Sequence, residues 1–181
     1  MKRKIIIYTF IFICIILFFK NCGFQIGNVR IGKQSDLSIK QNENLSESDF
    51  YKTYYSKDKL IILNLWATWC EPCIGEIPIL NEIKDINKQS NIAFLSISVD
   101  TDSIKLINFN KTKKFHFDDI TLKNILFRRA IFNTLEGKKP DSWISSQNVP
   151  ITYLIKNKIV LKKIDGTITK TELKIAIDKY K

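Results

Sequence analysis

The chain has 181 residues, of which 45% are hydrophobic, and its formal net charge is +11. This length fits one domain of ordinary size plus an anchor or linker, and the apolar content excludes wholesale disorder. Nucleic-acid binding is disfavoured, because the basic residues are spread widely and form no stripe with interleaved aromatic residues.

An apolar segment, residues 5–19, follows the basic residues 2–4 at the N-terminus. Its length suits a signal-peptide core and is short for a membrane-spanning helix, which needs about 20 residues. A cleaved signal peptide is disfavoured because the sequence has no A-x-A-like cleavage site. A lipoprotein modified at Cys22 is disfavoured because the residues before Cys22 match the usual lipidation signal poorly. An uncleaved anchor over residues 1–22 is therefore favoured. All three interpretations place the following domain outside the cytoplasm, because the basic residues stay inside.

A connecting stretch follows the apolar segment. Residues 23–36 are polar and contain glycine, which is typical of a tether, and residues 37–39 are a candidate edge strand. A short helix is then predicted up to Tyr55, with Ser46 or Ser48 as its N-cap.

The first core strand is predicted over Leu60–Trp66, an apolar run interrupted only by Asn64. A helix follows over residues 71–87, with apolar residues repeating along one face. Pro72 lies in its first turn, where proline is tolerated, whereas Pro78 lies inside the helix and should kink it.

A second strand and helix are predicted over residues 92–99 and 103–113. This strand–helix–strand–helix order indicates a parallel core with right-handed crossovers. Another helix is predicted over residues 121–135, and residues 137–148 resemble a loop.

The C-terminal part begins with two short apolar runs, residues 151–155 and 159–164. Three residues with Asn157 in the middle separate them, which predicts a β-hairpin. The last helix is predicted over Lys170–Tyr180, where apolar residues share one face.

Two cysteines, Cys70 and Cys73, stand where the first predicted strand ends and its helix begins. A thiol at a helix start feels the partial positive charge of unpaired N–H groups, which favours its thiolate. Cys73, one turn later, can close a disulfide onto Cys70, which is the chemistry of a dithiol redox switch. A structural zinc site is not expected, because it needs four ligands and His116 is the one histidine. We interpret His116 as a loop or core residue rather than a catalytic one.

Several motifs together carry a resemblance to a known family. They are Trp66-Ala67-Thr68-Trp69-Cys70-Glu71-Pro72-Cys73, then Glu76 and Pro78, Ser98-Val99-Asp100, and Val149-Pro150-Ile151-Thr152. These motifs resemble the thioredoxin superfamily and, within it, the TlpA/ResA-like membrane-anchored thiol–disulfide oxidoreductases. The resemblance covers residues 37–181 and implies an α/β, thioredoxin-like fold with a central mixed sheet flanked by helices, behind the N-terminal transmembrane anchor.

The resemblance also implies roles for the residues of the site. Cys70 would be the exposed attacking thiolate, and the more buried Cys73 would resolve the mixed disulfide. Pro150 would be cis and would face the dithiol. Val149 would offer backbone groups to a substrate chain as an added strand, and Trp69 would form part of the docking surface. Neither a metal nor an organic cofactor is required.

Glu71 and Pro72 separate the two cysteines and are candidates for tuning their redox properties. A carboxylate close to Cys70 disfavours the thiolate, so we expect Glu71 to make the pair more reducing. The alternative is an exposed charge with little effect.

Asn64 stands where thioredoxins commonly carry a buried acid, and an amide cannot accept a proton from the resolving thiol. Glu76 is the expected replacement, because it lies three residues after Cys73 on the same helix face. It would be a proton acceptor or a group that tunes the potential. The alternative is an exposed glutamate that only complements the helix dipole.

Residues 123–147 exceed what the family usually needs, and they end beside the Pro150 turn. This apparent insertion, which includes Arg128 and Arg129, either shapes the choice of partner or forms a surface helix without a role.

The expected function is thiol–disulfide exchange outside the cytoplasm, reducing disulfides in exported proteins and drawing electrons from an upstream membrane dithiol protein. One such substrate would be apocytochrome c before haem attachment. A peroxiredoxin-like peroxidase is an alternative. Its reactive cysteine would lie in a T-x-x-C motif, which Ala67-Thr68-Trp69-Cys70 does not match. The other alternative is a non-catalytic partner-binding or copper-delivery module, and the two-residue spacing argues against copper delivery.

Overall fold

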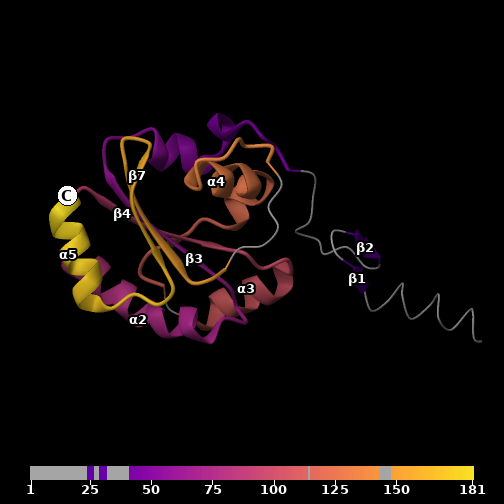
Figure 1. Cartoon of the computed structure of the whole chain (residues 1–181). Helices are drawn as coiled ribbons and strands as arrows, with labels where there is room; N and C mark the ends of the chain where they lie inside the picture. Colours follow the sequence, from indigo (N-terminus) through magenta and orange to yellow (C-terminus); the bar gives the residue numbers. More distant parts are fainter. Residues whose placement is uncertain (1–23, 27–28, 32–40, 114, 143–147) are drawn as a thin grey trace, which may run out of the picture. The chain divides into compact units, whose positions relative to one another are not determined.

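The computed structural model describes residues 24–26, 29–31, 41–113, 115–142 and 148–181 (Figure 1). The chain divides into two compact units, Met1–Ser38 and Ile39–Lys181. In the first unit, β1 (Phe24–Ile26) and β2 (Val29–Ile31) pair as antiparallel strands, which the sequence did not predict.

Several N-terminal expectations fall outside the described residues. They are the anchor over residues 1–22, the lipidation site at Cys22 and the candidate strand over residues 37–39. Within the described ranges, no helix is both long and apolar enough to cross a membrane.

The second unit is built on a five-stranded mixed sheet with the strand order β5-β4-β3-β6-β7. Its strands are β3 (Leu60–Trp66), β4 (Ile92–Ser98), β5 (Asp118–Asp119), β6 (Ile151–Lys156) and β7 (Ile159–Asp165). The β3–β4 and β4–β5 pairs are parallel, whereas β6 runs antiparallel to both β3 and β7. The predicted strands and hairpin are confirmed, and β3 lies at the centre.

Helices cover both faces of this sheet (Figure 1). On one face, Leu60 and Ile62 of β3 pack against α2 (Glu71–Ile86) and α5 (Lys170–Tyr180). On the other face, Ile61 and Leu63 pack against α4 (Arg128–Leu135) and the N-terminal turns. Successive side chains of β3 therefore point into two apolar cores, one on each face of the sheet, which explains why every residue of this strand is buried.

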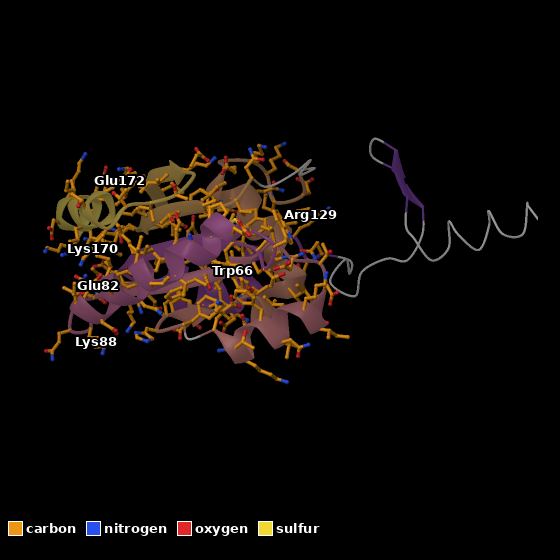
Figure 2. All side chains as sticks on the ribbon, turned by 90° about the horizontal axis from the view of Figure 1, so that it is seen from below. Trp66, Glu82, Lys88, Arg129, Lys170 and Glu172 are labelled. Carbon is orange, nitrogen blue, oxygen red and sulfur yellow. A yellow bond between two sulfur atoms is a disulfide. The ribbon has the colours of Figure 1, made fainter. Side chains whose placement is uncertain are left out.

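The helices α2 and α5 also meet at the surface. Lys170 and Glu82 form an ion pair between them, at the side of the molecule shown in Figure 2. Both helices match their predictions, as does α3 (Ser103–Thr112). Pro72 lies in the first turn of α2 and Pro78 lies within it, whereas the kink expected at Pro78 stays a prediction.

The segment 121–135 corrects the prediction of one continuous helix. It consists of the 3-10 helix η3 (Leu122–Phe127) followed by α4, with non-helical backbone angles at Asn124. The buried Asn124 side chain accepts from the Phe50 N–H (2.8 Å) and donates to the Ile120 carbonyl (2.9 Å). Such side-chain bonds to the backbone compete with a regular helix.

The segment before β3 is less regular than predicted. It consists of the 3-10 helix η1 (Leu45–Glu47) and the π-helical turn η2 (Tyr51–Tyr55). Of the two predicted caps, Ser48 is the one used, because its Oγ accepts from the Tyr51 N–H at 3.0 Å.

Candidate active site

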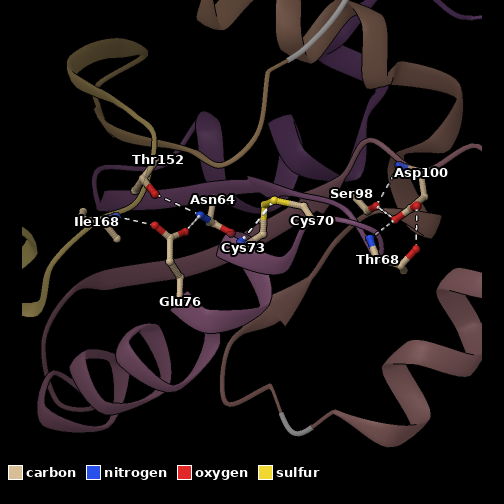
Figure 3. Close-up of a disulfide and its surroundings, with 9 residues drawn as sticks. All are labelled: Asn64, Thr68, Cys70, Cys73, Glu76, Ser98, Asp100, Thr152 and Ile168. Atoms are coloured by element: carbon tan, nitrogen blue, oxygen red, sulfur yellow. Dashed lines mark hydrogen bonds between the residues drawn. A yellow bond between two sulfur atoms is a disulfide. The ribbon is translucent and has the colours of Figure 1, made fainter.

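The two cysteines lie at the junction of β3 and α2 and form a disulfide (Figure 3). The strand ends at Trp66, whose carbonyl accepts from the Val99 N–H of the neighbouring strand segment at 2.9 Å. Cys70 is the N-cap of α2, and its Sγ accepts from the Cys73 N–H at 3.3 Å. The helix start therefore directs the Cys73 N–H at the Cys70 sulfur, which favours a thiolate there.

Both cysteines are buried in this oxidised form, with 4% of Cys70 and 1% of Cys73 exposed. Cys73 is the more buried of the two, as predicted, but the expected exposure of Cys70 is wrong for this form. The reason is that both sulfurs belong to an apolar cluster with Trp66 and Leu106. The exposed neighbour is Trp69, at 67%, which is consistent with a docking role.

Glu76 is buried beside the disulfide, with 2% of it exposed, so the alternative of an exposed helix charge is wrong. Its Oε1 accepts from the backbone N–H of Ile168, and its Oε2 accepts from Asn64 Nδ2 at 3.4 Å. Burial raises the pKa of Glu76 to about 6, although these two hydrogen bonds act to lower it. A carboxyl group with this pKa can exchange a proton near neutral pH.

Asn64 bridges Glu76 to the sheet. Its Nδ2 also donates to Thr152 Oγ1 at 3.1 Å, and the two residues are register partners on β3 and β6. Asn64 therefore orients the Glu76 carboxyl group and does not itself accept a proton. The contributions of Thr152 and Ile168 were not predicted, and nothing in the local sequence around Ile168 indicates its contact with Glu76, 92 positions away.

A second buried carboxyl group, Asp100, lies on the other side of the disulfide (Figure 3). Its Oδ2 accepts from the Thr68 N–H at 2.7 Å and its Oδ1 from Thr68 Oγ1 at 2.9 Å. Ser98 Oγ donates to the same Oδ2 at 2.6 Å. The sequence showed Asp100 only as the end of a strand, so its hold on the cysteine loop was missed.

The apparent insertion reaches the back of this network. Arg128 Nη1 donates to the carbonyls of Ser98 (3.0 Å) and Asp100 (2.6 Å). Asn133 is buried and donates to the carbonyls of Pro140 (2.9 Å) and Ser142 (2.8 Å). The described part of this segment is therefore integral to the domain, and the alternative of a surface helix without a role is wrong for it.

Trp66 lies in the interior, in the same apolar cluster as the dithiol. Its Nε1 donates to Asp119 Oδ2 at 3.1 Å. The centroid of its ring lies 5.0 Å from that of Phe109 and 5.3 Å from that of Phe115. Burial raises the pKa of Asp119, against hydrogen bonds from Thr121, Ser96 and Trp66 that lower it. Trp66 thus supports the site from inside the core.

The Val149–Pro150 peptide bond is cis, as the resemblance implied. Val149 packs against the cluster that contains both cysteines, so this turn lies beside the dithiol. Pro150 is buried, and its carbonyl accepts from the Gly166 N–H at 2.9 Å. Glu71 and Pro72 are exposed between the cysteines.

His116 is an exposed loop residue, in agreement with its interpretation. Its ring Nδ1 lies 2.6 Å from Asp85 Oδ2, and its backbone N–H donates to Asn81 Oδ1 at 2.8 Å. The described parts of the chain contain no group of three potential metal ligands.

The model of the AhpC/TSA family matches residues 33–163. The chain is 29% identical over 126 residues to thiol-disulfide oxidoreductase ResA of Geobacillus thermodenitrificans (strain NG80-2), covering 69% of this chain and 65% of that protein. It is 30% identical over 118 residues to a ResA of Bacillus cereus, covering 65% and 61%. The chain thus spans slightly less than two thirds of these curated relatives.

Solved structures share the fold. A thiol:disulfide interchange protein of the thioredoxin family from Chlorobium tepidum TLS superposes with a TM-score of 0.53 and 23% identity, covering 67% of this chain and 79% of that one. A thioredoxin-related protein from Neisseria meningitidis serogroup B superposes with a TM-score of 0.51 and 25% identity, covering 68% and 85%. The expected thioredoxin-like α/β fold is confirmed.

Proposed function

The chain belongs to the AhpC/TSA family, and from this premise and its similarity to ResA proteins we propose that it is a thiol–disulfide oxidoreductase of the ResA type that reduces disulfides in other proteins. The observation that carries the proposal is the Cys70–Cys73 disulfide at the start of α2. This pair combines a thiol at a helix N-terminus with a partner one turn away, which is what reversible exchange needs.

The reduced protein would act in two steps. The Cys70 thiolate attacks one sulfur of a substrate disulfide, forming a mixed disulfide and releasing the first substrate thiolate. The Cys73 thiolate then attacks the Cys70 sulfur and releases the second substrate thiolate. Two electrons have passed to the substrate, and the protein is left with the Cys70–Cys73 disulfide seen in the structure.

Glu76 would accept the proton of Cys73 before the second step. It lies one turn further along α2, it is buried, and burial raises its pKa to about 6. Near neutral pH such a group is mostly ionised and still basic enough to take a thiol proton. Asn64 and the Ile168 N–H hold the carboxylate in place.

Substrate docking would use the surface around the exposed Trp69 and the Val149–Pro150 turn. Trp69 offers a large apolar side chain next to Cys70, and Val149 lies at the edge of the dithiol cluster. An extended substrate segment could pair with the backbone there and bring its disulfide to Cys70.

The proposal is tested by trapping substrates on Cys70. In the Cys73→Ala variant the second step is blocked, so mixed disulfides should accumulate on Cys70 and be recovered with their partners. The control is the double variant Cys70→Ala/Cys73→Ala, which keeps Cys14 and Cys22 and should trap nothing. Equal recovery from both variants, or failure of the parent protein to reduce insulin, would contradict the proposal.

We further propose that the domain works outside the cytoplasm, held to the cytoplasmic membrane by residues 5–19 or by lipid on Cys22. The basic and apolar N-terminal pattern supports this. An upstream membrane dithiol protein would return electrons, and apocytochrome c is a substrate candidate. Loss of cytochrome c haem attachment in a Cys70→Ala strain, together with recovery of the protein from membranes, is expected.

A further inference from the structure

We propose that Asp100 and Arg128 are positioning residues, which hold Thr68 and through it keep Cys70 in place to pair with Cys73. The inference rests on the proposed thiol–disulfide exchange and assigns part of its equilibrium to residues outside the Cys-x-x-Cys motif.

Asp100 holds Thr68 at two points. One carboxylate oxygen accepts from the Thr68 N–H at 2.7 Å and the other accepts from Thr68 Oγ1 at 2.9 Å. Backbone and side chain of one residue are thus held by one carboxylate. Thr68 stands two residues before Cys70, so this contact restricts the loop that carries the attacking sulfur.

The carboxylate is itself held from the side of the sheet. Ser98 Oγ donates to Asp100 Oδ2 at 2.6 Å and accepts from the Asp100 N–H at 3.0 Å. The side chain of Asp100 therefore has donors at both oxygens, as a buried carboxylate requires. Ser98 therefore fixes the orientation of the carboxylate that Thr68 contacts.

Arg128, at the start of α4, holds the backbone on which Asp100 lies. Its guanidinium donates to the carbonyls of Ser98 and Asp100, so the end of β4 is tied to a helix that follows it by about 30 positions. Burial lowers the pKa of Arg128, whereas the nearby Asp100 charge raises it. The cation thus offsets part of the cost of burying the carboxylate.

The disulfide equilibrium depends on how often the two sulfurs meet. The turn from Ala67 to Cys70 is closed by the hydrogen bond from the Cys70 N–H to the Ala67 carbonyl at 3.1 Å, and Asp100 holds the residue inside that turn. A loop released at Thr68 would sample more positions for Cys70. The effective concentration of one thiol at the other would fall, and with it the tendency to form the disulfide.

The test is the equilibrium of the full-length protein with glutathione, followed by mass spectrometry of the Cys70–Cys73 peptide. In Asp100→Asn the amide has a single oxygen and cannot accept from Thr68 at both points. The equilibrium constant for oxidation by glutathione disulfide should fall about tenfold, equivalent to about 30 mV. The matched control is Asp102→Asn, a carboxylate two positions on that caps α3 through the Lys105 N–H (3.0 Å) and should stay within twofold of the parent.

A second variant, Thr68→Val, keeps the backbone bond to Asp100 and removes the hydroxyl bond, so a fall of about threefold is expected. It decides the outcome if Asp100→Asn does not fold. A purely structural role would lower the stability of the oxidised and reduced forms equally and leave the equilibrium constant unchanged. Values within twofold of the parent in the folded variants, or an equal shift in Asp102→Asn, would overturn the inference. Failure to reduce any protein disulfide, with a normal glutathione equilibrium, would contradict only the proposed function.

Discussion

Two buried carboxyl groups lie on opposite sides of the disulfide (Figure 3). Glu76 contacts Ile168, just before α5, and the Asp100 backbone contacts Arg128 of α4. Among the residues that the structure describes, Glu76 has two hydrogen-bond donors and no cation paired with it. Asp100 has donors from Thr68 and Ser98 and the charge of Arg128 nearby.

This difference separates two uses of a buried acid. Without a cation, burial dominates at Glu76 and raises its pKa to about 6, which suits a group that gains and loses a proton. With Arg128 behind it and two oxygens occupied by donors, Asp100 suits the holding of a loop. The same side-chain chemistry therefore serves proton transfer on one side and positioning on the other.

The largest effect is expected when the Asp100 side loses its cation. In Arg128→Met the carbonyls of Ser98 and Asp100 lose their donors, and the free energy of unfolding should fall by about 3 kcal/mol in urea denaturation. The control is Arg129→Met. Arg129 forms a partly exposed ion pair with Glu43, so its loss should cost less than about 1 kcal/mol. Equal losses in both variants would remove the distinction.

The raised pKa of Glu76 should make the free energy of unfolding depend on pH. A carboxyl whose folded pKa of about 6 lies above its ordinary value of 4.5 stabilises the fold below the lower value, and this contribution is lost as pH rises through about 6. The parent should therefore lose about 2 kcal/mol over this range relative to Glu76→Gln, measured by urea denaturation between pH 4 and pH 8.

The control for this experiment is Glu82→Gln, which removes an exposed glutamate on the same helix. Glu82 contributes only its exposed ion pair with Lys170, so the change in the free energy of unfolding between pH 4 and pH 8 should stay within about 1 kcal/mol of that of the parent. The Glu76→Gln variant should also reduce insulin about a hundredfold more slowly, because the proton acceptor is lost. A thiol titration and a reduction rate equal to those of the parent would end the catalytic interpretation of Glu76.

The smallest effect is expected for Glu71, the exposed carboxylate between the cysteines. In Glu71→Gln the Cys70 thiolate is no longer disfavoured, so the equilibrium constant for oxidation by glutathione disulfide should fall about twofold and the potential become less negative. The difference should vanish in 1 M salt, where the Debye length is about 3 Å. An unchanged or more negative potential at low salt would exclude the effect.

The local parts of the site could be predicted from sequence alone. The apolar run of β3, the helical repeat of α2 and the cysteines at their junction are adjacent in the chain, so periodicity and spacing sufficed. The burial of Glu76 was not evident from the helix pattern, because its face is decided by what packs against it. Asn124 likewise interrupts the predicted helix, and its side chain bonds the Phe50 N–H 74 positions away, a contact that no local pattern shows.

What the sequence by itself determined is a dithiol at the start of a helix, flanked by acids at fixed spacing, within a strand–helix pattern. What only the tertiary structure decided is which partner each acid has. Glu76 meets Ile168 across 92 positions, and Asp100 meets Thr68 across 32. A buried polar group takes its donors from whichever elements pack around it, and that packing depends on the arrangement of the sheet and helices rather than on any local pattern.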